Sequence, residues 1–312
     1  MTKPEFWNNN KRYYDFKSFL INTFGCKAYK LQIDAGFTCP NRDGTISTGG
    51  CIYCNSQFSN LRQTGPLPTI KDQICRGKKL YARMRGAKKF IAYFQTATNT
   101  YAPREKLKIL YDEALLQEDI IGIAVGTRPD CVPDDVIDLF ESYARDYNVW
   151  IEYGLQSIHD RTLDFINRGH HAETFIDAVE RTAGRNINIC VHMIVGLPGE
   201  TRYDALDTAR SIASLPVNGI KIHLLLALEG TVLGDLYKAE KIKMIQKDEY
   251  IATVCDILEI LPPHMVIQRL TADGYRDKYL APDWGRNKMD VLNSIDKELE
   301  RRNSWQGLRF NE

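Results

Sequence analysis

Residues 30–54 read KLQIDAGFTCPNRDGTISTGGCIYC, and this stretch decides which fold we expect. Its first part, residues 30–37, is a short apolar run of the kind that forms a buried strand. Three cysteines, Cys39, Cys51 and Cys54, then fall within sixteen residues. The sequence therefore predicts a loop rich in cysteine directly after the first strand.

Strand-like and helix-like segments alternate along most of the chain. Apolar runs typical of strands occur at residues 30–37, 90–95, 120–126, 149–155, 187–195 and 219–226. Longer amphipathic stretches typical of helices lie between them, at residues 104–116, 133–147 and 201–215. This alternation indicates βαβ units and a parallel sheet. We therefore predict an α/β fold, a partial (β/α)6 TIM-like barrel with a small C-terminal α/β extension.

The pattern changes near Gly230, where we place a domain boundary. Beyond it, two helices and a strand between them are expected at residues 248–261, 288–302 and 265–270. A proline pair ends the first of these helices, as proline does when it interrupts a helical pattern. We expect a core barrel with the cysteine loop at residues 15–230 and an extension at residues 231–312.

The composition is that of an ordinary globular protein. The chain has 312 residues, with 41 Lys and Arg against 40 Asp and Glu, and it is 44% hydrophobic and 26% charged. It has no apolar run of roughly 18 residues and a polar N-terminal segment, so we expect no transmembrane helix, secretory signal or membrane partner. Eight cysteines without an export signal indicate a reducing compartment, so we expect a cytoplasmic protein without disulfides.

Three interpretations of the cysteine loop compete. Active sites of parallel barrels lie in the loops that follow the strands, and a CxxC pair such as Cys51 and Cys54 commonly binds one metal centre. A structural zinc ion usually takes four ligands, and no second CxxC or suitably spaced histidine supplies the fourth locally. Incidental cysteines in a loop rich in glycine are another alternative. A [4Fe–4S] cluster held by three thiolates leaves one iron open, and we favour this interpretation.

The cysteine loop resembles that of the radical S-adenosylmethionine (SAM) superfamily, including an aromatic residue, Tyr53, directly before the last cysteine. The gap of eleven residues between the first two cysteines is longer than usual, but such gaps are known in the branch containing Elp3, the catalytic subunit of Elongator. The stretch DAGFTCPNRDGT and the tail at residues 267–284 resemble the bacterial YtqA/YhcC-like family most. Other motifs similar to the Elp3 branch are GTRPD at 126–130, EYGLQS at 152–157, NRGH at 167–170 and HMIVGLPGET at 192–201.

The resemblance implies two cofactors, a [4Fe–4S] cluster bound by Cys39, Cys51 and Cys54 and a SAM molecule bound by the open iron. In the superfamily, the reduced cluster cleaves SAM to methionine and a 5′-deoxyadenosyl radical, which abstracts hydrogen from an unactivated carbon. The cofactors supply this chemistry, and the protein positions them and excludes side reactions.

The resemblance also implies contacts to SAM at the ends of the strands. The backbone of Tyr53 and of Gly196 would face the adenine, where glycine lets the chain approach closely. Gln156 or Ser157 would reach the ribose hydroxyls.

On the methionine half of SAM, Arg128 would pair with the carboxylate. Gln95 and Thr96 take the place of the superfamily's Gly-Gly-Glu motif, which is absent from this chain, and would contact the amino group. Asp130, two residues after Arg128, is also explained as the cap of a helix.

Glu152, His192 and His223 are the catalytic candidates, because alternation along a strand can turn them toward the interior of a barrel. Each has a structural alternative, with Glu152 as the buried partner of an arginine and the histidines as satisfied core residues. We expect His170 and His171 to lie on a solvated turn. Four residues of the tail can border the active site, namely Arg269, Asp273, Trp284 and Lys288.

A strongly basic segment is hidden by the near-neutral total. Residues 61–90 hold nine Lys and Arg against one acid, Asp72, so nine minus one gives +8 in a chain whose total is +1. A basic helix face beside an active-site mouth suits contacts with nucleic-acid phosphates, while a solvated helix face is the alternative. The RNA-binding candidates are Arg76, Lys78, Lys79, Arg83, Arg85, Lys88 and Lys89, and Arg62 belongs to the same segment.

The resemblance implies a radical SAM enzyme that acts on the wobble uridine of transfer RNA (tRNA). Elp3 installs a carboxymethyl-type group at C5, but it needs an acetyltransferase domain, for which the roughly 80 residues after the barrel leave no room. The YtqA/YhcC-like family implies remodelling of an existing side chain from carboxymethylaminomethyl to aminomethyl, which is our leading hypothesis.

The partners expected with this function are tRNA, an electron donor such as flavodoxin or ferredoxin, and a downstream methyltransferase. Two alternatives stay open. One is a radical enzyme for a small metabolite or peptide, and the other is a non-enzymatic metal-binding module.

Overall fold

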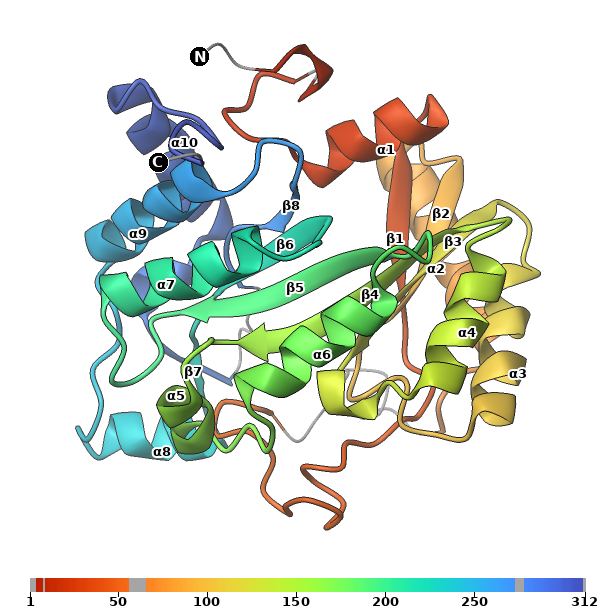
Figure 1. Cartoon of the computed structure of the whole chain (residues 1–312), viewed down its shortest axis with the longest axis horizontal. Helices are drawn as coiled ribbons and strands as arrows, with labels where there is room; N and C mark the ends of the chain where they lie inside the picture. Colours follow the sequence, from red (N-terminus) through yellow and green to blue (C-terminus); the bar gives the residue numbers. More distant parts are fainter. Residues whose placement is uncertain (1–3, 8, 56–65, 273–277, 311–312) are drawn as a thin grey trace.

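The computed structural model describes residues 4–7, 9–55, 66–272 and 278–310, and its centre is one parallel sheet (Figure 1). The seven strands follow the order β1-β2-β3-β4-β5-β6-β8, and every neighbouring pair is parallel. The sheet curls into a half-barrel, so the predicted partial barrel is confirmed. The strands are β1 Ala28–Ile33, β2 Lys89–Phe94, β3 Ile120–Thr127, β4 Asn148–Gln156, β5 Asn188–Val195, β6 Gly219–Leu224 and β8 Val266–Arg269.

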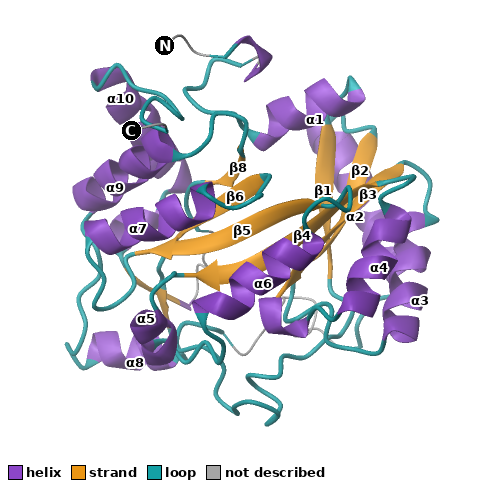
Figure 2. Ribbon diagram, in the orientation of Figure 1, coloured by secondary structure: helices purple, strands orange, loops and turns teal. Residues whose placement is uncertain are grey.

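Helices follow the strands and cover the outer face of the sheet (Figure 2). They are α2 Ile70–Arg85, α3 Arg104–Leu115, α4 Asp134–Tyr143, α6 Ala172–Thr182 and α7 Arg202–Ala213, while the short α5 Asp160–Phe165 lies at the end of the sheet beside α8. α7 begins with a capping box in which Thr201 and Asp204 satisfy each other's backbone amides. None of the described helices is long and apolar enough to cross a membrane.

The two faces of each strand differ, as the period of two residues requires. On β4, Ile151, Tyr153 and Leu155 pack with apolar side chains of the outer helices in the main core. The alternate residues Trp150 and Glu152 therefore face the inner side of the curl, which we call the lumen. Trp150 belongs to a separate apolar cluster there.

An aromatic cluster closes the N-terminal end of the lumen. The segment before the sheet contains η1 Glu5–Trp7 and α1 Phe16–Phe24. The rings of Phe16 and Phe19 contact Trp150 edge-on, with centroids 5.8 and 5.3 Å away. Aromatic rings therefore pack at the N-terminal end of the lumen, opposite the C-terminal ends of the strands.

The C-terminal extension contributes to the main sheet as well as packing on it. β8 pairs with β6 and forms the seventh strand, which the sequence pattern did not assign to the barrel. The expected boundary near residue 230 stays a prediction. The extension also contains β7 Ala227–Leu228, α8 Val232–Lys238, α9 Lys247–Ile260, β9 Tyr279–Ala281, η5 Asp283–Arg286 and α10 Lys288–Arg301.

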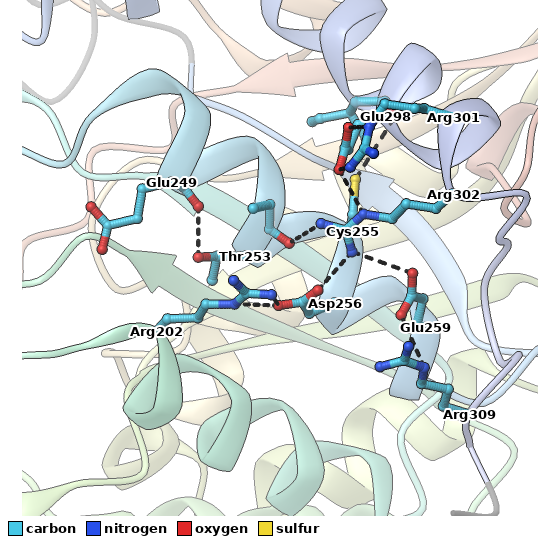
Figure 3. A network of polar contacts seen from close by, with 12 residues as sticks. Arg202, Glu249, Thr253, Cys255, Asp256, Glu259, Glu298, Arg301, Arg302 and Arg309 are labelled. Atoms are coloured by element: carbon cyan, nitrogen blue, oxygen red, sulfur yellow. Dashed lines mark hydrogen bonds and ion pairs between the residues drawn. The ribbon is translucent and has the colours of Figure 1, made fainter.

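A network of charged residues joins α9 and α10 (Figure 3). Arg302 lies between three carboxylates, with Nη1 2.6 Å from Asp256 and 3.3 Å from Glu259, and Nε 2.7 Å from Glu298. Arg202 on α7 also pairs with Asp256. The network therefore fastens both helices of the extension to a helix of the barrel.

Candidate functional site

The cysteine loop joins β1 to α2 at the C-terminal end of the sheet, where the sequence predicts it. Turns inside the loop fix the backbone at the cysteines. The amide of Arg42 donates to the carbonyl of Cys39 (2.8 Å), and the amide of Cys54 donates to the carbonyl of Cys51 (2.9 Å). The backbone at the cysteines is thus held by hydrogen bonds within the described part of the loop.

Ile52 fastens the loop to its surroundings on two sides. Its amide donates to the carbonyl of Ile166 just after α5 (3.0 Å), and its carbonyl accepts from the amide of Leu233 in α8 (2.8 Å). Figure 1 shows the loop at the lower edge of the view, near α5 and α8. Elements from both the barrel and the extension therefore position the cysteines.

Cys51 is buried, and two side chains donate to its sulfur. Asn41 Nδ2 and Arg168 Nη1 each lie 3.7 Å from Cys51 Sγ. The carbonyl of Gly154 on β4 holds the arginine by accepting from Nη2 at 2.6 Å. A Cβ atom at position 154 would lie 2.7 Å from that nitrogen, so glycine is required for this approach. N–H groups directed at a metal-ligating sulfur are typical of iron–sulfur sites.

Sequence patterns did not identify Arg168, although it belongs to the NRGH motif. Its partner sulfur lies 117 positions away, so no local pattern links the two residues. In the structure the side chain of Arg168 is only 7% exposed, and a buried charge of this kind needs a buried partner. Tyr53 belongs to the same surroundings: burial raises the pKa of its hydroxyl, and the neighbouring Cys51 thiol adds to this shift.

The three sulfurs of the cysteine loop do not form a compact group of ligand atoms in the described structure. Among the described residues, only Glu152, Cys190 and His192 bring three potential ligand atoms within 4.8 Å of one another. The loop sulfurs are therefore more widely spread, as ligands to different irons of one cluster must be. Burial raises the pKa of the Cys54 thiol, with Arg42 opposing this shift, and metal binding would release the proton.

The candidate contacts for adenosine gather at the ends of β4 and β5. Gln156 ends β4 in the left-handed conformation, with φ 79°. The Ser157 hydroxyl donates to Glu200 Oε1 (2.5 Å), so it already has a partner. Gly196 follows β5 with φ 92°, and a Cβ there would lie 2.9 Å from the side chain of Ile245. The structure brings these residues to one rim, and their contact with SAM stays a prediction.

The candidate contacts for methionine lie at the ends of β2 and β3. Thr96 is buried, and its hydroxyl has no partner within the described part of the chain, while Gln95 before it is half-buried. Arg128 makes two hydrogen bonds to Asp130 (2.9 and 2.8 Å) and donates to the carbonyl of Arg168 (2.7 Å). Asp130 therefore holds Arg128 and caps no helix, and a SAM carboxylate would share this guanidinium.

Deeper in the lumen, Glu152 on β4 is the centre of a polar network from four other strands. Its Oε1 accepts from Lys30 on β1 (2.5 Å), and its Oε2 accepts from the hydroxyl of Tyr93 on β2 (2.8 Å) and from Nε2 of His192 on β5 (2.9 Å). Lys221 on β6 also pairs with Oε2. Glu152 is thus the partner of two lysines, and not of an arginine as the sequence suggested.

Burial and neighbouring charges fix the protonation states in this network. Burial opposes the ionisation of Glu152, but Lys221 and Lys30 hold the pKa of this carboxyl well below its usual range. Burial lowers the pKa of Lys221 to about 8 and that of His192 to about 4. Burial also holds the pKa of His223 well below its ordinary value. At neutral pH the described residues of this network therefore comprise one carboxylate, ammonium groups and two neutral imidazoles.

The two histidines lie side by side, and His192 is satisfied by its hydrogen bond to Glu152, whereas His223 has an unpaired ring nitrogen among the described residues. Their ring centroids are 5.1 Å apart, the side chain of His192 is 19% exposed, and Nε2 of His223 has no partner within the described residues. Glu152, Cys190 and His192 are also a poor metal site, because two ammonium groups already contact the carboxylate. The histidines remain candidates for contact with a substrate.

We expected His170 and His171 to lie on a solvated turn. This prediction is wrong for His170 and confirmed for His171. His170 is 8% exposed, and burial together with the charge of Arg168 lowers its pKa to about 3. It is buried because its chain segment folds back beside the guanidinium groups of Arg168 and Arg128. His171 is exposed and pairs with Asp164 (3.1 Å).

The tail residues separate in the structure. Arg269 ends β8, and its charge contributes to the lowered pKa of His223 in the lumen. Trp284 donates to the carbonyl of Ile245 (3.2 Å), and Lys288 begins α10 on the surface. The last two lie in the extension, where the ring of Trp284 packs beside that of Tyr250 on α9. Asp273 lies outside the described residues.

The basic segment forms α2, but its place differs from the expected one. α2 starts after the cysteine loop and ends beside the start of β2, so it runs from the C-terminal to the N-terminal edge of the sheet. At 1.5 Å per residue, its basic last turns lie about 20 Å from its start. Lys78 and Lys89 pair with Asp119 (3.3 and 3.1 Å). Arg62 lies outside the described residues, and the exposed candidates without such a pair are Arg76, Lys79, Arg83, Arg85 and Lys88.

The position of α2 corrects the expectation of a patch beside the active-site mouth. Only its first turns are near the cysteine loop, because a helix that follows a parallel strand must return along it. A bound RNA would therefore have to extend along the outer side of the half-barrel to meet the whole basic face.

Family models cover most of the chain. The model described as the radical SAM superfamily matches residues 42–212, and the model described as the radical SAM C-terminal domain matches residues 217–301. YtqA of Bacillus subtilis (strain 168) is 42% identical over 307 residues, which are 97% of this chain and 94% of YtqA. YhcC of Escherichia coli (strain K12) is 37% identical over 286 residues, which are 91% of each protein.

Two more distant matches are an enzyme named for tRNA and a protein of the Elp3 type. A protein of Methanocaldococcus jannaschii named tRNA uridine(34) acetyltransferase is 25% identical over 157 residues, which are 49% of this chain and 28% of that protein. The solved structure of Methanocaldococcus infernus Elp3 matches with a TM-score of 0.61 and 18% identity, covering 89% of this chain and 64% of the other. At that identity the likeness is one of fold.

Proposed function

The chain belongs to the radical SAM superfamily and is a radical SAM enzyme, and from this premise we propose that it remodels the C5 side chain of the tRNA wobble uridine. The proposed change converts a carboxymethylaminomethyl group to an aminomethyl group. The observation that carries the proposal is the lumen itself, where two lysines surround a single buried carboxylate beside two neutral histidines. A lumen of this kind suits a small polar side chain that bears a negative charge.

The residues present fit the cofactors that the family implies. Cys39, Cys51 and Cys54 would hold a [4Fe–4S] cluster, with Arg168 and Asn41 donating to the Cys51 sulfur. When bound, the cluster and SAM supply a radical that abstracts a hydrogen atom. The chain orients the reactants at the rim and keeps water from the lumen floor, which the aromatic cluster closes.

The proposed reaction balances without a further oxidant. The carbon between the amine and the carboxylate loses one hydrogen atom and one electron, water adds to it, and its bond to nitrogen breaks. The products are the aminomethyl group and glyoxylate, and SAM leaves as methionine and 5′-deoxyadenosine. The electron given up by the substrate replaces the one that an electron donor such as flavodoxin or ferredoxin supplies to begin the turnover.

The relatives support tRNA as the substrate without identifying it. The name of the M. jannaschii relative places its action at uridine 34 of tRNA. The matched segment is only 28% of that protein, so we carry over the substrate class to our proposal and not the acetyl transfer. The free amine of the proposed product is a substrate for a methyltransferase, which is the downstream partner we propose.

The test is turnover by the reconstituted enzyme under anaerobic conditions. With reductant, SAM and tRNA that carries carboxymethylaminomethyluridine, we expect 5′-deoxyadenosine and glyoxylate in equal amounts. Cys39→Ala, Cys51→Ala and Cys54→Ala should each abolish both products. Cys75→Ala is the matched control, because Cys75 is an exposed cysteine on α2, away from the loop.

Two outcomes of this experiment would contradict the proposal in different ways. Formation of 5′-deoxyadenosine with a free amino acid or peptide, and not with tRNA, would replace tRNA by a small substrate. Cleavage of SAM by any of the three loop variants would show that the ligand assignment is wrong.

A further inference from the structure

The described residues of the lumen include more buried ammonium groups than carboxylates. The side chains of Lys30 and Lys221 are 14% and 6% exposed, and both pair with the same carboxylate, Glu152, which is fully buried. Among the described residues around this network, two ammonium groups thus share one carboxylate. A buried charge is stable only when it is paired, so the described residues leave this arrangement short of one anionic group.

One buried hydrogen-bond donor of the lumen also lacks an acceptor among the described residues. Lys30 donates to Gln268 Oε1 (2.6 Å), which leaves the amide nitrogen of Gln268 buried without a partner within the described residues. The two acceptor oxygens of Glu152 already receive four donors, from Lys30, Tyr93, His192 and Lys221. The missing group must therefore bring acceptor oxygens as well as negative charge.

The network is accessible from the open end of the half-barrel. His192 lies on β5, in the middle of the sheet, and helices cover the other face of that sheet. Its side chain is nevertheless 19% exposed, which requires open space on the lumen side. Glu152 lies two residues before Gly154, whose carbonyl holds the arginine at Cys51. Through Gly154 and Arg168, the cationic part of the lumen is thus close along β4 to the residues that contact the cysteine loop.

We propose that the lumen between Lys30, Lys221 and Gln268 binds a carboxylate of the substrate. One carboxylate supplies the single negative charge and the two acceptor oxygens that the network lacks, whereas a phosphate would bring excess charge. The inference deepens the proposed function, on which it rests for the identity of the substrate: the carboxylate is that of the carboxymethylaminomethyl group. The carbon that loses hydrogen would then be held next to the anchored carboxylate.

The test compares two nucleosides that differ only in this group. The dissociation constants of 5-carboxymethylaminomethyluridine and 5-aminomethyluridine are measured by calorimetry on the holoenzyme with SAM and without reductant, so that no turnover occurs. Hydrogen bonds to charged groups contribute enough for a preference of about tenfold or more for the carboxylate form.

Lys30→Met is the informative variant, because it leaves Glu152 and Lys221 as a balanced pair. The methionine would replace an ammonium that lies over the rings of Phe16 and Tyr93, at 4.6 and 4.9 Å, where a thioether also packs well. We expect the variant to fold and to bind both nucleosides with the same affinity. Lys221→Met, which leaves Glu152 paired with Lys30, should give the same result, and Lys106→Met on the exposed side of α3 should keep the preference.

Each outcome of this experiment supports or overturns the proposed carboxylate site. A carboxylate preference that is lost in both lumen variants supports the inference. Equal affinities for the two nucleosides in the unmodified enzyme overturn it, while the proposed function stands. If neither nucleoside binds but N-methylglycine does so in a way that depends on Lys30, the carboxylate site stands and the proposed function falls. If none of the three probes binds, the inference is wrong.

Discussion

Arg168 connects the cysteine loop to the lumen through two short contacts. It donates to the sulfur of Cys51 and, through its other terminal nitrogen, to the carbonyl of Gly154. A positive charge and an N–H donor beside a cluster ligand make an added electron more stable. Arg168→Met should therefore lower the reduction potential of the cluster, by some tens of millivolts, without loss of iron.

A redox titration followed by electron paramagnetic resonance measures this shift. Arg168→Lys is the control, because it keeps the charge and should recover most of the potential. An unchanged potential in Arg168→Met, with the cluster intact, would show that the arginine only supports the fold of the loop.

His192 makes the stability of the protein depend on pH. Burial, aided by the charge of Lys221, lowers its pKa to about 4, whereas the unfolded chain titrates near the ordinary value of about 6.5. In the window between these values the unfolded state takes up a proton that the folded state refuses. The free energy of unfolding should therefore decrease as the pH is lowered through this window. This residue contributes at most about 1.4 kcal/mol per pH unit to the decrease.

Denaturant unfolding at several pH values, for the native chain and for His192→Gln, tests this expectation. The variant should show a shallower dependence in the same window. NMR titration of the imidazole rings gives a second reading, in which exposed His171 is the control because Asp164 raises its pKa. A His192 ring that titrates together with His171 would contradict the assignment of a buried neutral imidazole.

At the scale of elements, α2 is the tRNA contact that we propose. Lys79 and Arg83 are exposed on successive turns, so they share one face of the helix. Lys79→Glu with Arg83→Glu should weaken tRNA binding and make its dependence on salt concentration shallower, because fewer counterions are released. Turnover of a free nucleoside should not change.

Binding of labelled tRNA at several salt concentrations measures both quantities. Lys106→Glu on α3 is the control, since it changes the charge of another exposed helix. An unchanged salt slope in the double variant would mean that the basic face is only solvated.

The helices α9 and α10 offer a matched pair of arginines for a stability test. Both pair with Glu298, but the side chain of Arg302 is 18% exposed and also contacts Asp256 and Glu259, whereas that of Arg301 is 72% exposed. Removing the buried partner leaves carboxylates uncompensated, so Arg302→Gln should cost about 3 kcal/mol. Arg301→Gln should cost about 0.5 kcal/mol or less. Equal losses in the free energy of unfolding would contradict this account of the network.

Local sequence patterns determine the elements well and their long-range partners poorly. The expected strands at 149–155 and 187–195 differ by one residue at their ends from β4 and β5, because apolar runs and turn residues are local signals. The place of β8 in the main sheet depends on pairing with a strand nearly fifty positions away, which no local pattern reveals. The direction of α2 follows from the topology, and not from its composition.

The candidate site shows the same division. The three cysteines were predicted because they lie in one loop, and Glu152 and His192 because alternation turns them inward. Lys30 and Lys221 were missed, since a lysine in an apolar strand does not indicate its partner. The curl of the sheet brings β1 and β6 toward the same carboxylate, and only the folded chain shows this.

At the scale of the whole molecule, the half-barrel, the extension and the aromatic cluster together define one open end. The cysteine loop lies at that end, and both family models meet within the same sheet, since the C-terminal match includes β6 and β8. We therefore expect a single reaction site, with cofactors at the rim and the reacting side chain in the lumen.

The proposed change at the wobble uridine is tested by mass spectrometry of tRNA nucleosides from cells that lack this protein. Complementation with the native chain and with Cys51→Ala provides the matched comparison. We expect carboxymethylaminomethyluridine to accumulate and aminomethyluridine to decrease at the wobble position, and only the native chain to reverse this change. Wobble uridines that are unchanged in the deleted cells would contradict this expectation.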